Sequence, residues 1–249
     1  MGTRLLRKWV LLPLLSVEAI EYRFRIVEYF VRQSLEKDGF IQQLKQIGDL
    51  ERLISKSAMG RIQPREVLQL KKALIAISVL KTNLANTESA ELHHINDALH
   101  DCHQLTDKID STLQEDAPTL VSKGNVIKDG VDGELDEYRY LIGHSKDVMA
   151  EILQKETEAS GIPNLKLGFN NVFGYYLEVT AKHKHTVVPE HWIRKQTLAN
   201  AERYITEELK ELETKILQAE TAIQEIEERL FTRLIVQINE YIESIQANC

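Results

Sequence analysis

The last fifth of the chain carries apolar residues at alternating spacings of three and four. The seven positions that set this pattern are Leu209, Leu212, Ile216, Ala219, Ile223, Ile226 and Leu230. The spacing places their side chains along one narrow seam of a helix, as in helices that pair with a neighbouring helix. It continues to Ile245, and no Pro or Gly interrupts residues 206–247. We therefore predict a single helix of about 40 residues, roughly 60 Å long.

A second seam with the same spacing lies upstream, in residues 134–160. Its members are Leu135, Tyr138, Ile142, Ser145, Met149 and Ile152. Because a short insert separates the two seams, the chain must turn back between them. We expect the two helices to pack antiparallel.

The insert, residues 161–205, has the alternation of strands rather than of helices. Leu165, Leu167 and Phe169 alternate with polar neighbours, and after a turn at 170–172 a second alternating stretch runs over residues 175–180. Residues 191–198 and 202–205 are candidates for two further short strands. The pattern predicts a small antiparallel sheet at the tip of the helix pair.

Residues 1–131 alternate helical periods with short breaks. The expected helices are 4–11, 16–33, 39–47, 49–59, 64–81 and 90–113. Ser16 and Asp49 are suitable N-caps, and Pro64 suits a first helical turn. The fold class that follows is mainly α: a helical bundle with two long antiparallel helical arms and a small antiparallel β element inserted at their tip.

Charge separates the insert from the helix that follows it. Residues 164–205 contain six Lys and Arg against three acidic residues, whereas residues 207–228 contain eight acidic residues against two basic ones. The net charge of −7 for the whole chain hides this asymmetry. The basic insert, at the tip of the helix pair, attracts a polyanion. The acidic helix that follows it, which we call the stalk, repels one.

Sequence signatures of catalysis are missing. The chain has no P-loop, no G-x-S-x-G, no H-E-x-x-H and no C-x-x-C motif. Its two cysteines, Cys102 and Cys249, have no ligand spacing and indicate a reducing, cytoplasmic compartment. No run approaches 18 apolar residues, so we expect no membrane contact.

Two groups of polar side chains in the insert could contact phosphates. Lys182 and Lys184 lie in one candidate loop, and five donors surround one predicted turn: Arg194, Lys195, Gln196, Thr197 and Asn200. Arg, Lys, Gln, Thr and Asn are side chains that hold a nucleic-acid backbone. An ordinary solvated loop and a polar sheet face explain the same residues equally well. Tyr175 and Tyr176 could stack on bases, but packing within the sheet is the better explanation.

Three segments of the insert and its stalk closely resemble the clamp of the bacterial MutS mismatch-repair family. They are 166–170 (KLGFN), 173–179 (FGYYLEV) and 193–210 (IRKQTLANAERYITEELK). Shorter segments resemble the lever domain of that family: 1–9 with Pro13 and Leu14, 49–52 (DLER), 63–65 (QPR) and 132–136 (DGELD). The resemblance covers essentially the whole chain.

The resemblance implies a division into a lever, residues 1–146 and 207–249, and a clamp, residues 147–206. It implies that the clamp contacts the backbone of double-stranded DNA without reading sequence, and that the lever relays the nucleotide state of an ATPase domain. The implied DNA contacts add Asn170 and Asn171 to the residues above. ATP and Mg belong to the ATPase domain, which has no counterpart here, so this chain is expected to have no cofactor, no metal and no enzymatic activity of its own. A second copy of the protein and a MutL-type protein are the implied partners, in a cytoplasmic, nucleoid-associated setting.

Two other functions stay open. Long paired helices with a β tip also suit a coiled-coil scaffold that binds protein. The spacing of His93, Asp97 and His100, with His103 nearby, would place possible metal ligands on one face of the predicted helix 90–113. That metal site lacks a clear fourth ligand.

Overall fold

The computed structural model describes residues 2–183 and 187–249. Contacts between Cα atoms divide the chain into two units: residues up to Val131 together with Glu227–Cys249, and Asp132–Ile226. The second unit extends 15 residues before and 20 residues beyond the clamp inferred from the sequence, residues 147–206, and the lever and clamp boundaries stay predictions. Among the described residues, no helix combines the length and the apolar character that crossing a membrane requires.

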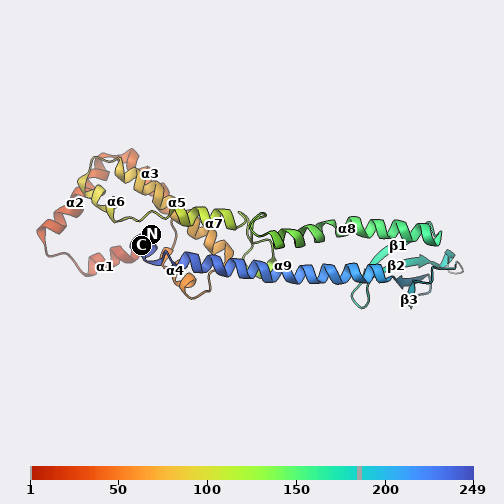
Figure 1. The fold of residues 1–249 in the computed structure, drawn as a ribbon. Coiled ribbons are helices and arrows are strands. Elements are labelled where there is room, and N and C mark those ends of the chain that lie inside the picture. The colour runs from red at the N-terminus through yellow and green to blue at the C-terminus, as the bar shows by residue number, and fades with distance from the viewer. Residues whose placement is uncertain (1, 184–186) are drawn as a thin grey trace. The chain divides into compact units, whose positions relative to one another are not determined.

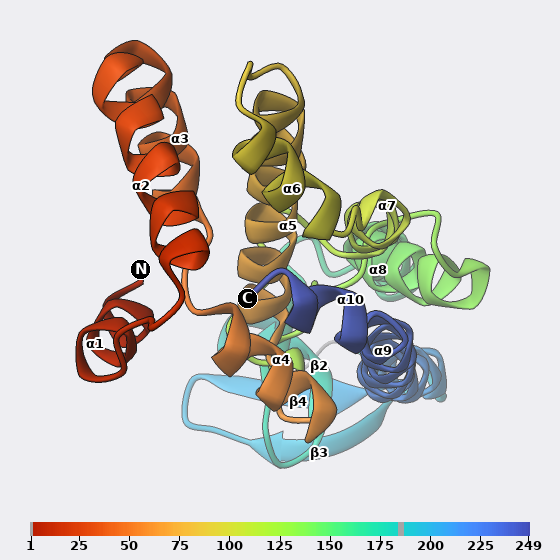
Figure 2. The same cartoon turned by 90° about the vertical axis from the view of Figure 1, so that its left-hand side faces the viewer.

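The first unit is helical (Figures 1 and 2). Its helices are α1 Thr3–Leu11, α2 Val17–Arg32, α3 Ser34–Gln46, α4 Leu50–Ala58, α5 Pro64–Ala85, α6 Ala90–Ala98, α7 His103–Thr112 and α10 Ile242–Ala247, with a short 3₁₀ turn at Val121–Lys123. Helix α5 is central, because α3, α6 and α7 all pack against it. Its buried face supplies Val67, Leu70, Leu74 and Ile77. Figure 2 shows α6 alongside α5 and α10 close to α4.

Two predicted helix starts are confirmed by their capping bonds. The side chains of Ser16 and Asp49 accept the N–H groups of Ala19 and Arg52, at 3.4 and 3.2 Å. Helix α3 begins five residues earlier than predicted, and α5 runs four residues further, to Ala85.

The predicted helix 90–113 is wrong, because the chain leaves the helical path between Ala98 and His103. The ammonium group of Lys81 donates to the carbonyls of Asn96 and Leu99, at 3.1 and 2.6 Å. The side chain of Asn248 bonds both the N–H and the carbonyl of His100, at 2.7 and 2.9 Å. These long-range bonds satisfy backbone groups that a continuous helix would satisfy itself.

The C-terminal helix is also shorter than predicted. Helix α9 covers Glu207–Asn239, and α10 begins only at Ile242. The side-chain amide of Asn239 is bonded to α4 through Ser57, whose hydroxyl donates to Asn Oδ1 at 2.7 Å. The contact fixes the chain where the helix ends, although no Pro or Gly marks the break.

The second unit contains α8 Gly133–Ser160, the first part of α9 and a sheet. Among the described residues the sheet has four strands, β1 Lys166–Asn170, β2 Gly174–Thr180, β3 Ile193–Thr197 and β4 Ala201–Ile205, in the order β1-β2-β4-β3. Every pairing is antiparallel. The predicted strands are thereby confirmed, and so is the mainly α fold with a small sheet.

Helices α8 and α9 lie antiparallel, as the two seams predict (Figure 1). The end of α8 meets the start of α9, where Lys155 and Glu208 form an ion pair at 2.7 Å. Seam residues Leu135, Met149 and Ile152 of α8 are buried.

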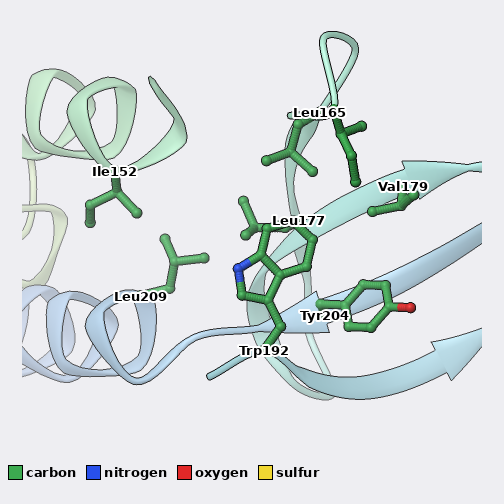
Figure 3. Packing of buried hydrophobic residues seen from close by; sticks show 8 residues of the cluster. Ile152, Leu165, Leu177, Val179, Trp192, Tyr204 and Leu209 are labelled. Carbon is green, nitrogen blue, oxygen red and sulfur yellow. The ribbon is translucent and has the colours of Figure 1, made fainter. Parts of the chain in front are cut away.

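One core joins these helix ends to the sheet (Figure 3). It is made of Ile152, Ile162, Leu165, Leu177, Val179, Trp192, Tyr204 and Leu209. The cluster contains residues from α8, β2, β4, α9 and the segments between them. Burial of their apolar surface therefore fixes the sheet against the end of the helix pair.

Thr206 caps α9, as its position before Glu207 and Glu208 predicts. Its buried hydroxyl accepts the N–H of Leu209 at 3.2 Å.

We expect Thr206→Ala to lower the free energy of unfolding by about 1 kcal/mol, measured by chemical denaturation. Thr206→Ser should retain most of that stability. Thr214→Ala, an exposed position in the same helix, should change it little; equal effects at 206 and 214 would contradict the capping role.

Candidate nucleic-acid interface

The register of the sheet decides which candidate residues lie together. Thr180 of β2 pairs with Ala201 of β4, and Lys166 of β1 pairs with Glu178. The ends of β2 and β3 and the β3–β4 turn therefore share one end of the sheet, which we call the distal end. Candidates Lys182, Thr197 and Asn200 lie there, and all three are exposed.

The distal end also contains a hollow of about 640 Å³. Its lining includes Lys182, Asn200 and a residue that sequence analysis did not select, Lys166. The backbone closes one side, since Ala181 N–H donates to the carbonyl of Asn200 at 2.9 Å. Lys166 could have been found by counting back from the turn at 170–172, because the hairpin places it opposite Glu178. Two lysines and an asparagine that line this hollow suit a phosphate group.

Asn170 and Asn171 lie at the opposite end of the β1–β2 ladder. The side-chain oxygen of Asn170 accepts the N–H of Val172 at 2.8 Å and closes the turn. Gly174, next to this turn, lies so close to Glu213 of α9 that a Cβ there would be 1.9 Å from the carboxylate. The structure therefore does not bring these two asparagines together with the candidates at the distal end.

The four candidates on β3 are divided by a bulge at Lys195. Arg194 pairs with Tyr204 and Gln196 with Arg203, so the register shifts between them. Because Lys195 is the extra residue, Arg194 and Gln196 lie next to different rows of β4 side chains. Lys195 itself is exposed at the sheet edge.

Two of these four residues already have partners inside the sheet. Gln196 accepts a hydrogen bond from the Arg203 guanidinium at 3.0 Å, and that guanidinium also bonds Glu178 at 3.0 Å. The same Arg203 lies 4.4 Å above the ring of Tyr176. Because Glu178 and Tyr176 fix Arg203, the bond from Arg203 keeps Gln196 within the sheet, where it is poorly placed to contact phosphate.

Arg194 has a partner inside the sheet but is still largely exposed to solvent. Its side chain is 61% exposed, yet Nη1 lies 3.4 Å from the buried carboxylate of Glu202. The hydroxyl of Tyr204 donates to the same carboxylate at 2.6 Å, and burial together with this bond raises the pKa of Tyr204 to about 12. Arg194 therefore stabilises a buried charge while leaving donors open to solvent.

Lys184 lies outside the described residues, as do His185 and Thr186. The two tyrosines are accounted for by packing, as expected. Tyr175 packs against the core cluster, and Tyr176 is buried on the other face beneath Arg203.

The histidine face proposed for a metal does not form, because the helix that would carry it is broken at residues 99–102. The ring of His93 bonds the carbonyl of Thr87 at 2.7 Å, and His103 lies 3.3 Å from the hydroxyl of Ser78. Across residues 2–183 and 187–249, no group of three or more His, Cys, Asp or Glu side chains has a geometry that could hold a metal ion.

A larger hollow, about 1030 Å³, lies within the first unit. Its lining is mainly apolar and includes Phe30, Phe40, Leu80 and Leu92. Because few polar groups converge on it, it does not suit a phosphate or a nucleotide.

The fold and the interface define a helical protein with an inserted four-stranded sheet whose distal end presents cationic and amide donors. The family model of MutS domain III matches residues 1–249, and the chain belongs to this family. It is 50% identical to a DNA mismatch repair protein MutS of Parabacteroides distasonis. The alignment spans 248 residues, 100% of this chain and 28% of that relative. MutS proteins of Bacteroides fragilis and Porphyromonas gingivalis are 49% and 46% identical, over 100% and 99% of this chain and 29% and 28% of their own lengths. The chain thus spans under a third of the length of these relatives.

Proposed function

We propose that the sheet of this chain binds the backbone of double-stranded DNA without reading its sequence, as the clamp of a mismatch-repair protein. Phosphate contacts position a protein on DNA but specify no base, which suits a protein that must scan every sequence. The helical part would act as a lever. In a longer protein it would relay the nucleotide state of an ATPase domain, and this part itself would catalyse no reaction.

One observation carries the proposal: exposed donors gather at the distal end of the sheet. Lys182, Asn200 and Lys166 line one hollow, and Lys195 is exposed on the neighbouring edge strand. Because the following helix is strongly acidic, a polyanion is attracted to the sheet and repelled by the stalk. The names of the relatives, DNA mismatch repair protein MutS, support the same function.

The proposal extends to partners in the longer protein. A second copy would close a ring around the duplex, and a MutL-type protein would act on the bound complex. The cytoplasm, on the nucleoid, is the setting in which such a protein meets DNA. A single copy, with few phosphate contacts, should bind weakly, with a dissociation constant on the order of 10⁻⁴ to 10⁻⁶ M.

The test is a titration of fluorescent duplexes, one matched and one with a mismatch, at several salt concentrations. We expect Lys182→Ala/Lys195→Ala to lower the slope of log K against log salt by about two, equally for both duplexes. Lys210→Ala/Lys215→Ala is the matched control, because it removes the same charge from the exposed surface of α9. Its slope should stay close to that of the parent chain.

Three results would contradict the proposal. Equal slopes for the two double variants would mean that the distal end makes no phosphate contact. A preference for the mismatched duplex would contradict binding that is blind to sequence. Self-association that salt does not change, without DNA binding, would favour the scaffold function instead.

A further inference from the structure

A buried carboxylate on α8 bonds the chain immediately before β3. Glu156 is 2% exposed, so its charge requires donors from the protein. The indole N–H of Trp192 donates to Oε2 at 2.7 Å. Nε2 of His191 lies 2.9 and 3.0 Å from the two carboxylate oxygens and donates to them, because an ionised carboxylate can only accept.

The two donors directly precede β3, which carries Arg194 and Lys195. Strand β3 stands at the edge of the sheet order and pairs with β4 alone. Its ladder is interrupted by the bulge at Lys195, so backbone pairing constrains it less than it constrains β2 or β4. A second attachment at its start therefore has a large effect on where its side chains lie.

Trp192 provides that attachment from two sides. Its ring packs in the core cluster near Leu177, Tyr204 and Leu209 (Figure 3). Its N–H reaches Glu156, four residues along α8 from the cluster member Ile152. The apolar contacts hold the ring in the core, and the hydrogen bond fixes its orientation.

We infer that Glu156 is a positioning residue for DNA binding: through His191 and Trp192 it fixes β3 in the place where Lys195 and Arg194 meet the duplex. The inference rests on the proposed function of the sheet. Glu156 is buried and touches no DNA itself, so it acts only through these two neighbours.

The experiment compares Glu156→Ala, Glu156→Gln and Ile152→Ala in the full chain. The first readout is amide hydrogen exchange, followed along residues 166–205 without DNA. Glu156→Ala removes the acceptor for both donors and should speed exchange in residues 193–197 at least about tenfold relative to β1 and β2, because losing even one buried hydrogen bond accounts for a factor of about ten. Glu156→Gln keeps an oxygen that can accept from Trp192, so its exchange should lie between those of the parent and the alanine variant.

Ile152→Ala is the structural control, since it removes apolar contacts from the same helix and the same core cluster. It should speed exchange evenly across the sheet, without singling out β3. The second readout is the salt slope of duplex binding. We expect Glu156→Ala to lower that slope by about one, through displacement of Lys195, and Ile152→Ala to leave it unchanged.

Even exchange across the sheet in Glu156→Ala, or full retention of the parent slope, would overturn the inference. Identical exchange and slopes in the Gln and Ala variants would overturn the role given to the Trp192 bond. If the parent chain binds no duplex, the proposed function fails, and the exchange pattern still decides whether Glu156 positions β3.

Discussion

Replacing Glu227 with leucine is expected to lower the free energy of unfolding of the first unit by about 2–5 kcal/mol. Glu227 is 0% exposed, and one of its oxygens lies 3.0 and 3.4 Å from the N–H groups of Val126 and Ile127. Positive φ angles at Gly124 and Asn125 shape the turn that presents these two groups. The donors belong to the backbone of residues 126 and 127, so a substitution at position 227 leaves both in place.

Because the backbone donors stay in place, leucine at position 227 should lower the free energy of unfolding although its side chain fills a similar volume. Apolar replacement of a buried ion pair is often neutral, but only when both partners are replaced. Here two buried N–H groups would lose this acceptor, at up to about 1–3 kcal/mol each. Glu227→Gln keeps a carbonyl oxygen and should lose less than half as much.

Chemical denaturation, with hydrogen exchange at residues 126 and 127, measures the effect. Glu228→Leu is the matched control, because Glu228 is exposed at the next position of the same helix. We expect it to change stability by no more than about 0.5 kcal/mol. A Glu227→Leu variant within 1 kcal/mol of the parent would show that the carboxylate does not hold this turn.

Element types could be predicted from the sequence wherever one periodicity persisted. The seams of residues 134–160 and 206–230 predicted the antiparallel helices, and the alternation in the insert predicted the strands. The interruptions at residues 99–102 and 240–241 could not be predicted in this way. They depend on Lys81, Asn248 and Asn239, whose partners lie far away in the chain.

The candidate interface was predictable only in part, for a similar reason. Composition indicated which residue types could hold phosphates, but the strand register decides which of them share an end of the sheet. The register separates Asn170 and Asn171 from the candidates at the distal end of the sheet and adds Lys166 to them. The bulge at Lys195 had no sequence signal, so alternation alone could not assign Arg194 and Gln196 to their partners.

The core that fixes the sheet to the helix ends is the other place where a large effect is expected. Leu177→Ala should lower the free energy of unfolding of the second unit by about 2–5 kcal/mol. Leu177 is 0% exposed and lies in the centre of the cluster, between Trp192, Val179 and Leu209 (Figure 3). Truncation removes apolar contacts and leaves a cavity that the surrounding strands and helices cannot fill completely.

The matched control is Leu217→Ala, the same substitution at a position of α9 that is 55% exposed. It should change stability by no more than about 0.5 kcal/mol, because the leucine there is already largely in water.

The chain has two tryptophans, Trp9 and Trp192, one in each unit. In a Trp9→Phe background, the fluorescence of Trp192 therefore follows unfolding of the second unit during chemical denaturation. Equal losses for Leu177→Ala and Leu217→Ala would contradict the packing of this core. A large loss for Leu177→Ala alone would show that the sheet owes its attachment to the cluster, since an isolated four-stranded sheet with one apolar face has nothing else against which to bury it.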